Sequence, residues 1–171
     1  MDSTKIGELE NQLDHKFKNK KELYRALTHS TFSNVEREKP VGARDCPHQT
    51  TYATLGDAIL KACFILLLME KGWNTKGAIT ISKADLENNL KLAEVGERLH
   101  LLEDHLFLHR IGGEEKVSEG AETYRSDTVE ALIGAIFIDN NYDLRQTKDC
   151  ISKIFAPELQ EMEKRHRSEL F

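Results

Sequence analysis

The sequence predicts an all-α fold, and three observations support that class. Apolar residues recur three or four positions apart along almost the whole chain, which is the spacing of one helix face. No paired strand pattern, internal repeat or strand–helix alternation appears. The 171 residues are 39% hydrophobic and 31% charged, with only 10 Gly and 3 Pro, which excludes collagen-like, low-complexity and wholly disordered chains. We therefore expect one domain that buries its own core.

Two short helices are expected to open the chain. The first covers Ile6 to Leu13, and the second covers Leu23 to Leu27 after Asn19 as its cap. The polar stretch from Ser33 to Thr51 contains two prolines and a glycine, so it is predicted to be a long loop. Leu55 to Met69 is apolar nearly all round, which indicates a helix buried on most sides.

The second half of the chain is also expected to be helical. Its predicted elements are residues 78–99 as two helices or one broken helix, 101–108 as a further helical stretch, 111–121 as a Gly-rich loop, and 126–138 and 143–155 as helices. Ser126 or Asp127 is the expected cap of the helix that ends before Asn140. This pattern places one domain over residues 1–156 and a charged helical tail over 157–171.

Composition also limits the function. The longest apolar run, Ala62 to Met69, is shorter than the roughly 20 residues that span a bilayer, so no membrane crossing is expected. The start of the sequence lacks a secretory pattern and the 3 cysteines are odd in number, which favours a reducing, cytoplasmic location. The net charge of −5 argues against a protein that binds nucleic acid through a basic surface over the whole molecule.

Two carboxylates stand at helical spacing before an apolar segment. Asp127 and Glu130 are three residues apart, so their side chains share one side of a helix, roughly 5–6 Å apart at Cβ. Such a pair repels unless it is protonated or bridged by a cation, and Mg²⁺ or Mn²⁺ suits hard oxygen ligands. From spacing alone, a solvated helix start is the favoured explanation of the pair.

A third acid lies in apolar surroundings. Asp57 is the only charge between Asp45 and Lys61, so it needs a partner if the segment is buried. The alternatives are an N-cap after Gly56, an ion pair with Lys61, or a metal site shared with the two acids of the later helix. Spacing alone does not choose among them.

Four phrases appear in one order along the chain: Ala26-Leu27-Thr28-His29-Ser30, Leu55-Gly56-Asp57-Ala58-Ile59-Leu60, Lys83 to Asn89, and Asp127 to Asp139. Together they resemble the endonuclease domain of the ribonuclease III family over most of the chain. The resemblance implies an all-helical fold for residues 1–156, a symmetric homodimer, and Mg²⁺- or Mn²⁺-dependent hydrolysis of double-stranded RNA. The implied products carry 5′-phosphate and 3′-hydroxyl ends.

The resemblance also implies site residues, one by one. The metal-binding acids of the family fall on Asp57, Asp127 and Glu130, and Asp57 and Glu130 are the implied catalytic residues. A fourth family carboxylate falls on Ala53, where this chain has no ligand. The aromatic residue that enters the partner subunit in the family falls on Thr54.

The Mini-ribonuclease III branch resembles the chain in three features. It has a small residue at the position of Ala53, a phrase like Thr123-Tyr124-Arg125, and no attached duplex-binding domain. The resemblance places Lys83, Asn88 and Asn89 on the helix nearest the family's cleft, as candidate RNA contacts, although a solvated helix face explains Lys83 equally well.

Two other classes of function stay open beside the nuclease. Ala53 and the net charge of −5 favour both of them. A catalytically impaired relative would act as an RNA-binding or ribosome-associated protein. A plain helical interaction module would share only ancestry with the enzymes. The three acids favour the nuclease, because a silent relative has no need of three carboxylates in one cleft.

Overall fold

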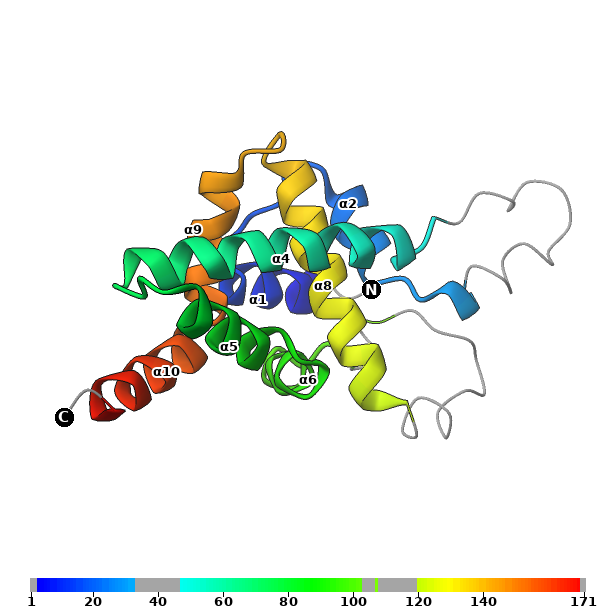
Figure 1. Cartoon of the computed structure of the whole chain (residues 1–171). Helices are drawn as coiled ribbons and strands as arrows, with labels where there is room; N and C mark the ends of the chain where they lie inside the picture. The colour runs from blue at the N-terminus through cyan, green and yellow to red at the C-terminus, as the bar shows by residue number, and fades with distance from the viewer. Residues whose placement is uncertain (1–2, 33–46, 103–106, 108–119, 170–171) are drawn as a thin grey trace, which may run out of the picture.

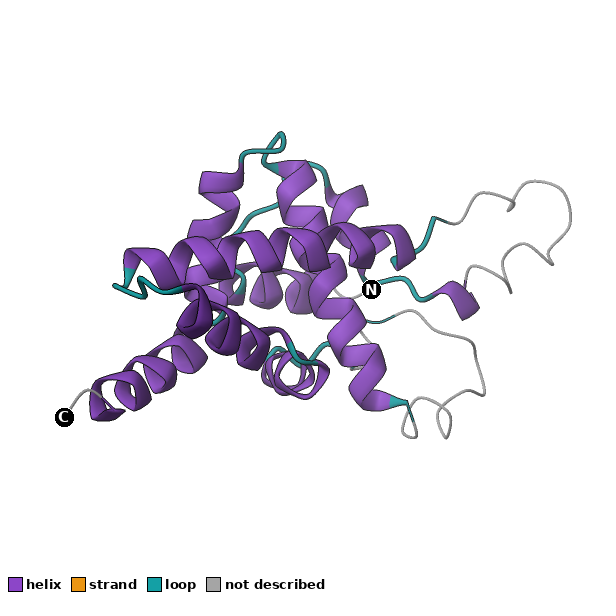
Figure 2. Cartoon of the chain, viewed as in Figure 1, coloured by secondary structure: helices purple, strands orange, loops and turns teal. Residues whose placement is uncertain are grey.

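The computed structural model of the chain describes residues 3–32, 47–102, 107 and 120–169. Within those ranges the regular structure is helical and contains no strand (Figure 2). The helices are α1 (Ser3–Gln12), α2 (Lys20–Ala26), α4 (Thr50–Glu70), α5 (Lys76–Glu87), α6 (Asn89–Arg98), α8 (Ala121–Asp139), α9 (Leu144–Ile154) and α10 (Ala156–Glu169). The predicted all-α class is confirmed.

The two longest helices, α4 and α8, cross at the centre of the fold (Figure 1). Helix α8 also packs against α2 and α6, while α4 packs against α5 and α9. Both helices contribute large apolar side chains to the buried core, among them Phe64 and Leu68 of α4 and Leu132 and Ile136 of α8. The core is therefore built around one helix–helix crossing.

That crossing brings backbone against backbone because both helices place a glycine at it. A Cβ atom on Gly56 would lie 1.7 Å from the backbone oxygen of Glu130, and one on Gly134 would lie 2.3 Å from the backbone oxygen of Tyr52. No side chain fits at either position. Since Asp57 follows Gly56 directly, the crossing holds Asp57 beside Glu130.

Two predicted helix starts are wrong. Helix α4 begins at Thr50 and not near Leu55, so Asp57 is not an N-cap. Helix α8 begins at Ala121, so neither Ser126 nor Asp127 caps it. A hydrogen bond of the Ser126 hydroxyl explains why Ser126 lies inside α8 and does not cap it. Ser126 Oγ donates to the Thr123 carbonyl of the preceding turn at 3.0 Å, which satisfies the serine inside the helix.

Other elements agree with the sequence prediction. The two opening helices are present as α1 and α2, and the segment 78–99 is two helices that meet at Asn88. Helix α9 is capped by Asp143, which accepts from Gln146 N–H at 3.0 Å. The predicted helical stretch 101–108 and the predicted loops 33–51 and 111–121 lie mostly outside the described residues.

Helix α4 is only partly covered by the rest of the chain. It is long and apolar enough to cross a membrane by length and composition, and 39% of its most apolar window is buried. Here α4 packs against α8, α5 and α9, as the core helix of a globular fold does. The prediction that it is buried on most sides is wrong for the single chain, because Leu66 is 38% and Met69 56% exposed.

The C-terminal helix α10 packs on the fold instead of forming a wholly solvated tail. Leu159 and Met162 are buried in the core. The rings of His166 and Trp73 stack with their centroids 4.2 Å apart. The predicted division of the chain between residues 156 and 157 stays a prediction.

Candidate metal centre

Three acidic side chains line one pocket of about 410 Å³ at the α4–α8 crossing. They are the three predicted ligands, Asp57, Asp127 and Glu130. The full lining is His29, Ser30, Gln49, Thr50, Ala53, Thr54, Asp57, Asp127 and Glu130. The structure therefore brings the predicted acids together on one cavity.

Each helix contributes its pocket residues from successive turns. Ala53 and Asp57 lie one turn apart on α4, and Asp127 and Glu130 lie one turn apart on α8. Asp127 is the seventh residue of α8, so the interpretation of this acid pair as a solvated helix start is wrong. The pair lies instead on the side of α8 that faces α4.

Gln49 lines this pocket and links three segments around it. Its side chain is almost fully buried, and its backbone N–H donates to the Thr28 carbonyl at 2.9 Å. Its Oε1 accepts from the Thr128 hydroxyl at 3.2 Å. One residue thus joins the segment after α2, the start of α4 and the acidic face of α8.

The pocket makes the charged form of its acids costly. Burial, and then the negative charges of Asp57 and Asp127, raise the pKa of Glu130 from 4.5 to about 7. Burial also raises the pKa of Asp127. A cation bound among these groups would relieve both the repulsion and the loss of water.

One cation of the chain already contacts this site. The ammonium of Lys61 lies 2.7 Å from Asp57 Oδ2, so the predicted ion pair is confirmed. The apolar segment around Asp57 predicts a buried side chain, but the structure leaves this side chain 40% exposed. The hydrogen bond to Asp57 raises the pKa of Lys61.

The donor set fits a hard divalent ion. Carboxylate oxygens from two helices are the ligands that Mg²⁺ and Mn²⁺ take. Within the described ranges, no three His, Cys, Asp or Glu side chains stand close enough to hold an ion as they lie. Binding therefore requires Asp57, Asp127 and Glu130 to turn inward toward a shared ion.

The three predicted RNA contacts are not among the residues that line the pocket. Lys83 lies within α5, and Asn88 and Asn89 lie at the junction of α5 and α6. Lys83 pairs with Glu87 at 2.6 Å. Asn88 caps α6 by accepting from the Lys91 N–H at 2.8 Å, and Asn89 is exposed as the first residue of that helix. Lys83 and Asn88 thus have structural partners, and RNA contact at this junction stays a prediction.

Sequence reasoning did not select His29 as a pocket residue. Its Nδ1 accepts from the Thr31 N–H at 3.2 Å, and its ring meets Tyr124 edge-on with centroids 4.7 Å apart. His29 belongs to the Leu-Thr-His phrase and Tyr124 to the Thr-Tyr-Arg phrase. The two phrases are the sequence signal that could identify His29 and Tyr124 as neighbours of the site. The spacing of the two residues along the chain does not show that their rings meet.

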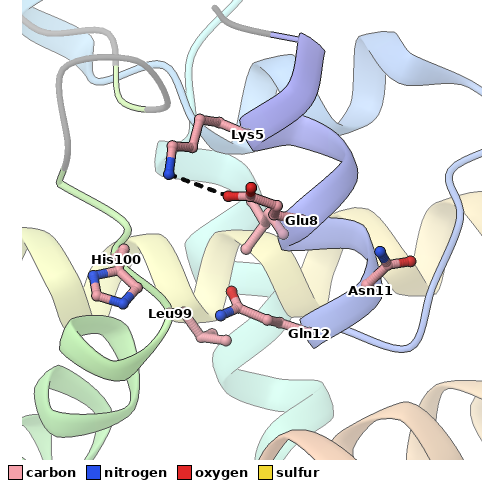
Figure 3. Close-up of a pocket in the computed structure, with 7 residues that line it drawn as sticks. Lys5, Glu8, Asn11, Gln12, Leu99 and His100 are labelled. Carbon is pink, nitrogen blue, oxygen red and sulfur yellow. Dashed lines mark ion pairs between the residues drawn. The ribbon is translucent and has the colours of Figure 1, made fainter.

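A larger hollow, of about 460 Å³, lies between α1 and the end of α6 (Figure 3). Its carboxylate, Glu8, pairs with Lys5 on the same helix at 3.2 Å. The other polar side chains that line it include the amides of Asn11 and Gln12. With one paired acid it lacks the ligand set of the α4–α8 pocket.

The sequence profile of ribonuclease-III-like proteins matches residues 19–159, which include every residue of the acidic pocket. The chain belongs to the ribonuclease-III-like family. Ribonuclease 3 of Bordetella pertussis is 33% identical over 146 residues, which are 84% of this chain and 51% of that protein. Ribonuclease 3 of Bdellovibrio bacteriovorus is 30% identical over 152 residues, 87% of this chain and 60% of the relative. This ribonuclease-III-like chain thus spans about half the length of the curated relatives it matches.

Solved structures agree with the ribonuclease-III-like fold. Two structures of the nuclease domain of ribonuclease III from Campylobacter jejuni superpose with TM-scores of 0.71 and 0.72, at 26% and 25% identity. They cover 87% and 92% of this chain and 94% and 97% of the compared chains. The first is described as flexible in a region involved in dimer formation.

Proposed function

We propose that the chain is a divalent-metal-dependent endoribonuclease that hydrolyses double-stranded RNA to 5′-phosphate and 3′-hydroxyl ends. The observation that carries the proposal is the meeting of Asp57, Asp127 and Glu130 on one pocket. Membership of the ribonuclease-III-like family supports a nuclease over an interaction module.

The pocket suits phosphodiester hydrolysis. A Mg²⁺ or Mn²⁺ ion, when bound, supplies an activated water and neutralises charge on the reacting phosphate. Asp57 from α4 and the Asp127–Glu130 pair from α8 would hold it. Burial and the neighbouring acids raise the pKa of Glu130 to about 7, so a bound cation would favour its ionised, metal-holding form near neutral pH.

The open side of α4 supports a homodimer. Leu66 and Met69 are 38% and 56% exposed on this helix, and Ala58 and Thr54 extend the exposed stripe toward the pocket. Apolar side chains exposed along a core helix are typical of an interface. A two-fold axis beside α4 would pair two acidic pockets, one from each copy.

Duplex RNA is expected to lie over the pocket and the α5–α6 junction. Lys83, Asn88 and Asn89 would contact its backbone there. Because the whole chain carries a net charge of −5, binding should be weak without metal and should fall steeply with salt. Asn89→Ala should weaken duplex binding several-fold without changing the melting temperature.

A cleavage assay tests the proposal. The purified chain is incubated with a long RNA duplex and Mg²⁺, and the product ends are mapped by their competence for ligation. Wild type should cleave, while Asp57→Asn and Glu130→Gln should lose at least about 100-fold in rate, as removal of charge-stabilising groups does. The matched control is Glu122→Gln, an exposed acid in the first turn of the same helix α8.

A catalytically impaired RNA-binding relative is the second candidate. Ala53 favours it, because this pocket residue presents a methyl group where the resemblance implies a carboxylate. Duplex binding with no cleavage in Mg²⁺ or Mn²⁺ at millimolar concentration would establish this second function and overturn the first.

A further inference from the structure

The ammonium of Lys61 lies among carboxylates from three helices. It pairs with Asp57 on its own helix at 2.7 Å. Burial and the neighbouring acids raise the pKa of Glu130 on α8, and the positive charge of Lys61 offsets part of that rise. The charge of Glu87 on α5 acts on Lys61 as well. Lys61 is therefore a member of the acidic site although it stands just outside the lining of the pocket.

One face of α4 carries an uncharged residue, an acid and a lysine on consecutive turns. Ala53, Asp57 and Lys61 follow one another at four-residue spacing, so they occupy consecutive turns of one face. The first is uncharged, the second is negative and the third is positive. Three carboxylates, those of Asp57, Asp127 and Glu130, and the ammonium of Lys61 together carry a net charge of −2 when all four are ionised.

We propose that Lys61 is a built-in cation of this site, so that the pocket binds one divalent ion per protomer and not two. The inference rests on the proposed function and specifies its metal content. A single ion of charge +2 neutralises the set. A second ion would enter a neutral pocket with no uncommitted carboxylate, and two cations would repel each other there.

Glu87 is a positioning residue for this arrangement. Its Oε1 pairs with Lys83 at 2.6 Å, while its Oε2 is buried without a hydrogen-bond partner in the described part of the chain. Helix α5, which carries Glu87, packs directly against α4. When an ion takes Asp57, Lys61 can turn toward this unpartnered oxygen and remain in the site as its fixed positive charge.

Metal binding to the RNA-free chain tests the proposal. Calorimetry and Mn²⁺ electron paramagnetic resonance should show one ion per protomer in wild type. Lys61→Met should bind the first ion on the order of tenfold tighter, which is the effect of one unit charge a few ångströms from a divalent ion in water-like surroundings. The double variant Ala53→Glu/Lys61→Met, with a site charge of −4, should bind two ions.

Lys91→Met is the matched control, because Lys91 makes an equivalent ion pair with Glu94 at 2.8 Å on α6, outside the pocket. It should leave affinity and stoichiometry unchanged. If Lys61→Met does not fold, as judged by circular dichroism, Lys61→Gln replaces it, with the same expected gain in affinity. Glu87→Gln should alter the Mn²⁺ affinity of wild type and have no effect in the Lys61→Met background.

Two ions per wild-type protomer, or an affinity that Lys61→Met leaves unchanged, would overturn the inference and leave the proposed nuclease intact. One ion per protomer with the expected gain, in a chain that cleaves no RNA, would support the inference and overturn the proposed function. Failure to bind Mn²⁺ at millimolar concentration would overturn both.

Discussion

Lys61 lies one helical turn after Asp57 on α4, with its Nζ atom 2.7 Å from the Asp57 carboxylate. Both side chains are partly exposed, at 45% and 40%, so water screens the pair and it adds only about 0.3–0.5 kcal/mol to stability. Its importance is electrostatic, because the same ammonium acts on Glu130 across the helix crossing. Lys61 thereby influences the acids of both helices.

Restoring a carboxylate at position 53 should improve metal binding. Ala53 lines the pocket one turn before Asp57, so Ala53→Glu places an acid beside it. Mg²⁺ affinity should rise on the order of tenfold, while the melting temperature without metal should fall because like charges repel. Calorimetry and thermal melts check both, with Thr80→Glu on the exposed side of α5 as control. If neither quantity changes, residue 53 does not face the metal.

Glu130→Gln should stabilise the metal-free protein at neutral pH and above. The pKa of Glu130 is raised from 4.5 to about 7, so its contribution to stability is present below pH 4.5 and is lost as the pH rises through 7. Melting temperatures in a chelator should therefore match at pH 4.5 and diverge by pH 8, with the variant higher. A constant difference across this range would contradict the electrostatic account of the pocket.

Gly134→Ala should separate α4 from α8. Its new Cβ atom would lie 2.3 Å from the Tyr52 carbonyl, so the backbones must move apart. We expect a loss of about 1–3 kcal/mol in the free energy of unfolding and weaker metal binding. Gly7→Ala is the control, because the Cβ atom it adds meets nothing within 4 Å and alanine favours the helix by about 0.5–1 kcal/mol. Equal effects of both variants on urea unfolding would show that the crossing tolerates a side chain.

Asp139→Asn should weaken the link between the end of α8 and the segment before α2. Burial alone would raise the pKa of Asp139, but hydrogen bonds from the N–H groups of Asn19 and Lys18 and from His15 outweigh it, so the pKa is lowered. The ionised carboxylate thus stabilises the fold above its ordinary pKa of 3.8, and this contribution is lost as the pH falls through the lower native value.

We therefore expect Asp139→Asn to cost about 1.5–3 kcal/mol at pH 7, which is the range for hydrogen bonds to a charged group. The difference from wild type should shrink toward pH 3. Denaturant unfolding at both pH values checks this, and a difference that grows as the pH falls would contradict it.

Helical spacing predicted which acids share a helix face but not that the two faces meet. Asp127 and Glu130 are neighbours by periodicity alone, whereas their approach to Asp57 depends on Gly56 and Gly134 stacking backbone on backbone. That contact joins positions 78 residues apart, and no local pattern encodes it. The family resemblance supplied the missing tertiary information.

Buried polar side chains account for what the sequence did not predict. Glu10 is 6% exposed and accepts from the Phe17 N–H at 2.7 Å, although a glutamate in an amphipathic helix predicts a solvated position. The predicted loop 33–51 includes Gln49, yet this residue joins three segments from a buried position. Such residues are recognised only when their partners are known, because their burial depends on hydrogen bonds made across the fold.

Locating a bound ion tests the central claim most directly. Crystals grown with Mn²⁺ at millimolar concentration, measured near the manganese absorption edge, reveal its position by anomalous scattering. We predict one strong peak per protomer, bounded by the carboxylates of Asp57, Asp127 and Glu130 at about 2.0–2.3 Å. A peak elsewhere, or none in a pocket with all three acids ordered, would contradict the assignment of this pocket as the metal centre.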